Sequence, residues 1–131
     1  MSYIFTELIA AARAVAQPLD LANGGQAASV GAALLASDQR VYTGVCIDMA
    51  CGIGFCAEAS AMAEMLKSHA TRIKAAVAVD DQGQVLAPCG RCREMMLQLD
   101  PANAATLVAL PGGRELRLAE LLPQHWLVAT A

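Results

Sequence analysis

The chain alternates between stretches whose apolar residues recur at helical spacing and short runs of mostly branched apolar residues. Helical spacing and helix propensity predict four helices, over residues 2–16, 57–69, 89–99 and 118–122. Runs bounded by turn residues predict strands over residues 29–35, 41–47, 73–79 and 106–110, with 85–86 extending the third. Because helices separate the later strands, we expect crossover connections and a sheet covered by helices on both faces.

The length of 131 residues is typical of a single domain, which we assign to residues 1–131. Apolar residues make up 56% of the chain, yet no uninterrupted apolar run approaches the roughly 18 residues that a membrane span needs. Glu7 and Arg13 interrupt the first apolar residues, so the start does not resemble a secretion signal. We therefore expect a protein of the cytoplasm that does not bind membranes.

Charge narrows the class of partner. Nine basic and twelve acidic residues give a net charge of -3, and neither sign forms a block. Together with only 4% aromatic residues, this excludes the basic channel and stacking platforms that a nucleic acid polymer requires. Charged residues make up only 16% of the chain, which predicts that part of the apolar surface is covered in a homo-oligomer.

Five cysteines are expected to be reduced thiols in a cytoplasmic protein, and their uses are then metal binding, catalysis or packing. Cys56 stands two residues before Glu58, and Cys89 and Cys92 follow further along the chain. Zinc prefers thiolate ligands in tetrahedral geometry, and a catalytic zinc site has three protein ligands and one open position. We therefore predict that the three thiols bind one Zn²⁺ per chain.

The predicted helix starts favour this chemistry. Free amides and the positive dipole end of a helix stabilise thiolates, and Cys56 and Cys89 stand at such starts. Glu58 falls in the same first turn as Cys56, where a carboxylate can take a proton from zinc-bound water and return it to a substrate nitrogen. Three thiolates and one zinc ion sum to about one negative charge, which Arg91, or as a second candidate Arg93, is predicted to offset.

Other interpretations of these cysteines stay open. Two cysteines separated by two residues are also typical of a structural zinc site or a redox couple. A fourth ligand, Cys46 or Cys51, would close the zinc site and exclude catalysis. Otherwise Cys46 and Cys51 are small buried residues.

The triplet Cys56-Ala57-Glu58, followed by Pro88-Cys89-Gly90-Arg91-Cys92, resembles the zinc signature of the cytidine deaminase family. Val30-Gly31-Ala32-Ala33-Leu34-Leu35 and Tyr42-Thr43-Gly44 are similar to the two strands that precede the site in its small, three-cysteine, homotetrameric members. The resemblance implies an α/β/α sandwich with a mixed sheet, zinc on the three cysteines, and a homotetramer.

The resemblance also implies an activity, the zinc-dependent hydrolytic deamination of cytidine, deoxycytidine or a related cytosine nucleoside, as in pyrimidine salvage. In such an enzyme, zinc-activated water attacks C4 of the cytosine ring, Glu58 shuttles protons to N3 and then to the amino group, and ammonia leaves. Backbone groups around Ala57 hold the pyrimidine edge.

Several positions depart from the family pattern and bear on the substrate. The nucleoside enzymes usually carry an Asn-x-Glu pair that binds ribose, and the aligned residues here, Cys46 and Asp48, are candidate substrate-binding residues. Ala28 replaces an aromatic residue of the family, and Ala59 replaces the arginine that often follows the catalytic glutamate. The run from Pro88 to Arg93 resembles the blasticidin S deaminases, in which an arginine between the cysteines, here Arg91, can offset the thiolate charge. The alternatives are therefore a deaminase of a nucleoside antibiotic such as blasticidin S, or a non-catalytic zinc-bearing binding protein on the same fold.

Overall fold

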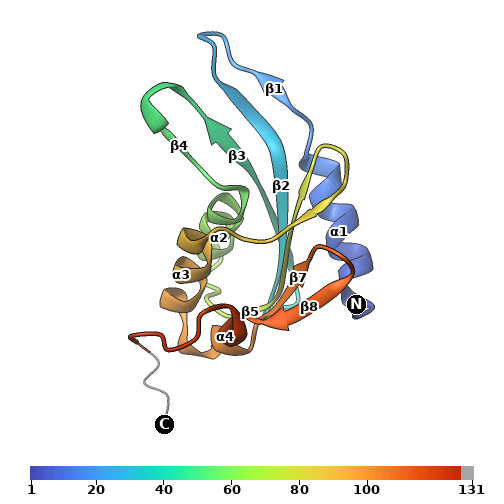
Figure 1. The fold of residues 1–131 in the computed structure, drawn as a ribbon, viewed down its shortest axis with the longest axis vertical. Coiled ribbons are helices and arrows are strands. Elements are labelled where there is room, and N and C mark those ends of the chain that lie inside the picture. Colours follow the sequence, from blue (N-terminus) through green and yellow to red (C-terminus); the bar gives the residue numbers. More distant parts are fainter. Residues whose placement is uncertain (128–131) are drawn as a thin grey trace.

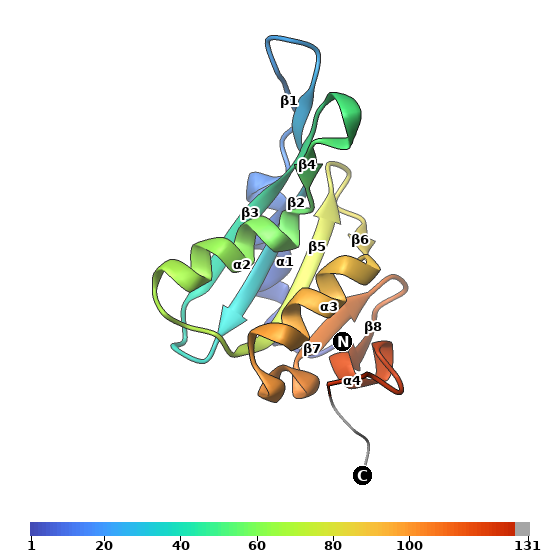
Figure 2. The ribbon, with the colours of Figure 1, turned by 90° about the vertical axis from the view of Figure 1, so that its left-hand side faces the viewer.

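The computed structural model describes residues 1–127, which form three layers with the sheet in the middle (Figure 1). Helix α1 (Ile4–Val15) covers one face of the sheet. The other face carries α2 (Ala57–Lys67), α3 (Gly90–Leu99) and the short α4 (Leu118–Leu121) (Figure 2). Among the helices of residues 1–127, we find none with both the length and the apolar character needed to cross a bilayer.

The sheet is mixed, and in the described residues its central path runs β4-β3-β2-β5-β7-β8. Short strands β1 and β6 pair with β2 and β5 outside this path. The parallel pairing joins β5 to β7, and the other pairings are antiparallel. The strand bounds are β1 Leu19–Asp20, β2 Gln26–Ala36, β3 Val41–Asp48, β4 Gly54–Phe55, β5 Ile73–Asp80, β6 Val85–Leu86, β7 Leu107–Leu110 and β8 Arg114–Arg117.

The structure confirms the α/β fold with a mixed sheet and helices on both faces. Each helix and strand predicted from the hydrophobic pattern is present, although α2 ends at Lys67 and β2 already begins at Gln26. Two 3-10 helices, η1 (Ala50–Gly52) and η2 (Pro101–Ala105), and the strands β1, β4 and β8 were not predicted. These segments have two to five residues each, which is too short for a hydrophobic period to appear.

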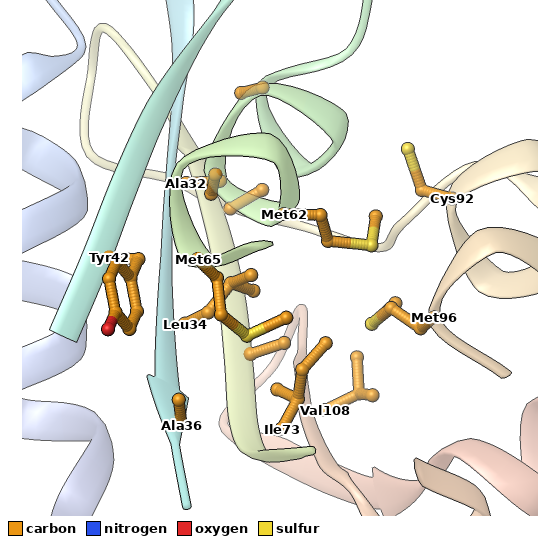
Figure 3. Close-up of a cluster of buried hydrophobic side chains, with 14 of the residues drawn as sticks. Ala32, Leu34, Ala36, Tyr42, Met62, Met65, Ile73, Cys92, Met96 and Val108 are labelled. Atoms are coloured by element: carbon orange, nitrogen blue, oxygen red, sulfur yellow. The ribbon is translucent and has the colours of Figure 1, made fainter. Parts of the chain in front are cut away.

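Two hydrophobic clusters hold the layers together, one on each face of the sheet. Under α1, Phe5 and Leu8 pack against residues of β2 and β5 such as Val77. Under α2 and α3, Met62 and Met96 belong to the larger cluster, whose side chains Figure 3 shows converging on the sheet. Methionine is unbranched and flexible, so it fills the irregular space between helix and sheet.

Small residues let the helices approach the sheet closely. A Cβ on Gly31 of β2 would lie 2.3 Å from the carbonyl oxygen of Ala12 in α1. A Cβ on Gly44 of β3 would lie 2.3 Å from the backbone nitrogen of Ala61 in α2. Because such contacts are forbidden to any larger residue, these glycines determine how deeply each helix sits, and Gly44 thereby positions the first turn of α2.

A buried asparagine joins the carboxyl end of α3 to the start of β5. The Asn103 side chain accepts a hydrogen bond from the backbone nitrogen of Ile73 (2.7 Å) and donates to the carbonyl oxygens of Thr71 (3.0 Å) and Met96 (2.8 Å). Thr106 donates to the carbonyl oxygen of Ile73 over 2.6 Å. We call this group of contacts the Asn103 junction; it anchors α3 relative to the central strand.

Candidate active site

Three thiols come together where two helices begin. Cys56 is the N-cap residue of α2, Cys89 is the N-cap residue of α3, and Cys92 lies in the first turn of α3. Their sulfur atoms all lie within 4.8 Å of one another, and the Sγ atoms of Cys56 and Cys89 are 3.4 Å apart. Tetrahedral zinc with bonds of about 2.3 Å to sulfur requires sulfur separations of roughly 3.8 Å, so this cluster fits the metal.

The surroundings of the three thiols act differently on their acidity. Burial opposes ionisation of Cys89, but the backbone N–H of Cys92 and the neighbouring thiols outweigh it and lower the pKa of Cys89. Burial raises the pKa of Cys56, and the guanidinium of Arg91 counteracts this. Burial and then the charge of Glu58 raise the pKa of the fully buried Cys92. A divalent cation in the cluster would relieve these costs, because it favours the thiolate form.

Glu58 lies in the first turn of α2, two residues after Cys56. Its side chain is buried, with a relative exposure of 6%, yet it borders the cavity described below. Burial raises the pKa of Glu58, and its own backbone N–H opposes this. A carboxyl group with a raised pKa is suited to both taking up and giving back a proton.

A cavity of about 350 Å³ opens beside the cluster. This volume is in the range that holds a whole small-molecule ligand. Its walls come from β2, β3, the η1–β4 segment and the starts of α2 and α3. Apolar side chains such as Ile53 and Leu86 form much of the wall, and Glu58, Asp48 and Arg91 supply the charges. The cavity therefore combines an apolar slot with a few polar groups.

The site residues predicted from the sequence lie around this one cavity. Ala57, Asp48 and Cys46 all contribute to its wall, as does Arg91. Asp48 and Arg91 are exposed, whereas Ala57 and Cys46 are buried. Arg93, the second candidate for charge compensation, instead donates hydrogen bonds to the carbonyl oxygens of Pro88 and Leu121. It therefore attaches the loop before α3 to α4.

The structure also decides between the interpretations of the remaining cysteines. Among residues 1–127, the metal-binding cluster contains the three predicted thiols and neither Cys46 nor Cys51. Cys51 is exposed in η1, and the sulfur of Cys46 contacts Ser29 and the backbone of Val30 instead. The expectation that Cys51 is buried was wrong. The three-thiol cluster leaves room for the open coordination position that a catalytic zinc needs.

Sequence reasoning missed two groups of cavity residues. Ser29 was placed within a strand without a role, because the pattern of β2 contains no sign of the irregularity at Ala28–Val30. Met49, Ile53 and Phe55 form an exposed apolar rim, with relative exposures of 45%, 62% and 42%. Glycines at positions 52 and 54 marked this segment as irregular, which was the available signal.

An α/β sandwich with a cluster of three thiols beside a cavity that a buried carboxylate borders has the features of a zinc-dependent hydrolase. Residues 6–108 match the family model described as the cytidine and deoxycytidylate deaminase zinc-binding region. The chain therefore belongs to the cytidine and deoxycytidylate deaminase family, and Zn²⁺ is its cofactor.

Two relatives of this chain are named cytidine deaminases. The chain is 38% identical over 96 residues to a cytidine deaminase of Mycobacterium tuberculosis, covering 72% of this chain and 70% of that protein. It is 35% identical over 97 residues to a cytidine deaminase of Halalkalibacterium halodurans, covering 72% and 74%.

Solved structures agree as well. The crystal structure of the cytidine deaminase from Mycobacterium tuberculosis superposes with a TM-score of 0.80 at 31% identity, covering 95% of this chain and 98% of that one. That of the enzyme from Mycobacterium leprae gives 0.79 at 30% identity, covering 94% and 100%. These likenesses extend over nearly the whole chain, beyond the segment that carries the cysteine motif.

Proposed function

We propose that this protein hydrolytically deaminates cytidine or deoxycytidine, with Cys56, Cys89 and Cys92 as zinc ligands and Glu58 as the proton shuttle. The observation that carries the proposal is that the three-thiol cluster, through Cys56 and Cys89, and the buried Glu58 carboxylate border the same ligand-sized cavity. The relatives described above, which are named cytidine deaminases, support the choice of substrate class.

Bound zinc lowers the pKa of a coordinated water and so supplies the nucleophile. Glu58 is placed to take one proton from this water and pass it to the ring nitrogen N3 as the oxygen bonds to C4. It would then take the remaining proton of that hydroxyl and pass it to the amino group, which leaves as ammonia while the C4 carbonyl forms. Its burial at the cavity wall keeps bulk water from competing for that proton. The backbone around Ala57, at the free amino end of α2, holds the polar edge of the pyrimidine.

Charge balance supports a role for Arg91. It stands between two thiols in the first turn of α3 and borders the same cavity. Because three thiolates and one zinc ion sum to about minus one, a single nearby guanidinium makes the centre neutral. Arg93 is engaged by backbone carbonyls, so Arg91 is the better placed of the two arginines.

The alternatives are separated by one set of measurements. Purified, zinc-loaded protein is assayed for zinc content and for ammonia released from cytidine, deoxycytidine, cytosine and blasticidin S, with Glu58→Gln as the blank. We expect one zinc per chain in both proteins and ammonia from a nucleoside with the wild type alone. Turnover restricted to blasticidin S would favour the antibiotic deaminase, and zinc without any ammonia would favour a binding protein. Undiminished turnover by Glu58→Gln would contradict the mechanism.

We propose further that the protein is a homo-oligomer, a homotetramer by family resemblance, in the cytoplasm. The exposed apolar rim of Met49, Ile53 and Phe55 supports the oligomer, because a second copy would cover it. The free thiols, including the three of the cluster, support a reducing compartment. Light scattering of the purified protein tests the first proposal, and a mass near 13.6 kDa would contradict it.

A further inference from the structure

A bulge in β2 lies directly in the cavity wall. Ala27 of β2 pairs with Ile47 of β3, and the next pair is Gly31 with Val45, so residues 28–30 of β2 all face the single residue Cys46. Ala28 has a positive φ of 64°, which regular strand excludes. Bulges next to active sites re-aim side chains, and this one lies among residues that border the cavity.

The bulge has a definite effect on side-chain direction. In a regular strand, consecutive side chains point to opposite faces of the sheet. Here the consecutive residues Ser29 and Val30 both border the cavity. The irregular backbone at Ala28 therefore places Ser29, with its hydroxyl group, in the cavity wall that β2 and β3 form.

Cys46 holds this arrangement in position. Its sulfur lies 3.3 Å from the backbone nitrogen of Val30, a donor that the bulge removes from regular pairing, and 3.3 Å from Oγ of Ser29. The thiol thus accepts the free N–H and fixes the rotamer of the serine. Cys46, a predicted substrate-binding residue, also borders the cavity, and its sulfur contacts both Ser29 and the Val30 N–H of β2. The Ser29 hydroxyl keeps hydrogen-bonding capacity beyond its contact with this sulfur.

The geometry points to Ser29 as a specificity-determining residue that hydrogen-bonds a sugar hydroxyl of the nucleoside, with Cys46 as its positioning residue. This inference rests on the proposed function. The reacting carbon of the base must lie at the helix starts, beside Glu58 and the thiols, and Ser29 belongs to the wall that β2 and β3 form. Ser29 therefore faces the part of the ligand away from the reaction.

A hydroxyl is the group that suits Ser29 in either hydrogen-bonding state. If Ser29 donates to the sulfur of Cys46, its lone pairs face the cavity; if the thiol donates, the serine proton is free for the ligand. A sugar hydroxyl both donates and accepts, so it pairs with Ser29 in both cases.

The test compares Ser29→Ala with wild type on cytidine and on its 2′-, 3′- and 5′-deoxy analogues. One neutral hydrogen bond is worth about a fivefold to tenfold change in kcat/KM. We expect that loss on cytidine, and we expect it to disappear on the one analogue that lacks the hydroxyl bound by Ser29. Ser37→Ala, an exposed serine in the turn after β2, is the matched control. A loss of equal size on all four substrates, or none on any, would overturn the inference.

Two further measurements separate this inference from the proposed function. Calorimetry should give weaker binding of uridine by Ser29→Ala than by wild type, with binding of uracil unchanged, and the kinetic loss on cytidine should lie in KM rather than kcat. Equal weakening of uridine and uracil binding would contradict the inference. Cys46→Ala should reproduce the substrate pattern of Ser29→Ala. Cys46→Ser should restore the wild-type pattern, because a serine hydroxyl can still accept a hydrogen bond from the Val30 N–H. A wild type that binds uridine through Ser29 but releases no ammonia would refute the proposed function and leave this inference standing.

Discussion

Buried polar groups lie near both ends of α3, and they have different kinds of partner at the two ends. At the Asn103 junction, the fully buried side chain of Asn103 makes three hydrogen bonds, all to main-chain groups of this protein. At the amino ends of α2 and α3, the buried Glu58 borders a cavity, and the buried Cys92 belongs to the metal-sized thiol cluster. Figure 2 shows the two regions at opposite ends of α3.

This difference indicates where the fold is stabilised and where it acts. Internal hydrogen bonds that satisfy every buried group make a rigid junction, whose loss costs free energy of unfolding. Buried groups whose partners come from outside cost stability until the ligand binds, and such groups are typical of functional sites. The two regions should therefore respond differently to substitution, one in stability and the other in metal content and turnover.

The largest effect is expected at the cluster. Cys92→Ser keeps the volume of the side chain but replaces a buried thiolate ligand with a hydroxyl, which zinc binds poorly. Zinc content should fall from one per chain towards zero, deamination should fall to background, and the thermal midpoint should no longer rise when zinc is added. Metal analysis and a thermal scan measure this. Cys51→Ser, at an exposed thiol outside the cluster, should change none of these quantities; if it did, the cluster would be assigned wrongly.

The Asn103 junction should show the opposite pattern. Asn103→Ala removes the side-chain partner of the buried Ile73 N–H, of the buried Met96 carbonyl and of the partly buried Thr71 carbonyl, so the free energy of unfolding should fall by about 3 kcal/mol. Zinc content and kcat of the folded fraction should stay close to wild type. Urea unfolding gives the stability, with Asn23→Ala in an exposed loop as the control. A junction variant that lost zinc but kept its stability would break the comparison between the two regions.

The cluster was predictable from sequence, whereas the junction was not. The spacing of Cys89 and Cys92, and the position of Cys56 and Glu58 at a helix start, are local features that appear in any reading of the chain. The partners of Asn103 include Ile73, which lies 30 residues away, and no local pattern encodes such a contact. Ser29 was missed for a related reason, because the bulge depends on the register of β2 against β3.

The close approach of α2 to the sheet connects stability with the site. Gly44→Ala would place a methyl group 2.3 Å from the backbone nitrogen of Ala61, so α2 must move away from β3. We expect a loss of about 1–3 kcal/mol in unfolding free energy. Turnover should also fall, because the same helix carries Cys56 and Glu58.

Gly90→Ala is the matched control for this substitution. A Cβ at Gly90, at the start of α3, meets no atom within 4 Å, so this variant should be at least as stable as wild type and should match it in turnover. Chemical unfolding and steady-state kinetics of the two variants give the answer. Equal effects at the two glycines would show that α2 is not held where the close contact places it.

The smallest effect is expected at an exposed turn that belongs to neither region. Tyr42 donates a hydrogen bond of 2.5 Å to the carboxylate of Asp38, and with the backbone N–H of Arg40 this lowers the pKa of Asp38 below its ordinary value of 3.8. Because the pKa is lower in the folded state, the ionised Asp38 carboxylate stabilises the fold at pH values above its ordinary pKa. This stabilisation is lost as the pH falls through the lowered pKa of the folded state. Asp38→Asn should therefore have a slightly lower thermal midpoint than wild type near pH 7, and the difference should shrink as the pH drops below about 4. Tyr42→Phe should show the same pH dependence, and the double variant should add little to either. A difference that stayed constant with pH would mean that the charge of Asp38 does not contribute, and that only the shape of the turn matters.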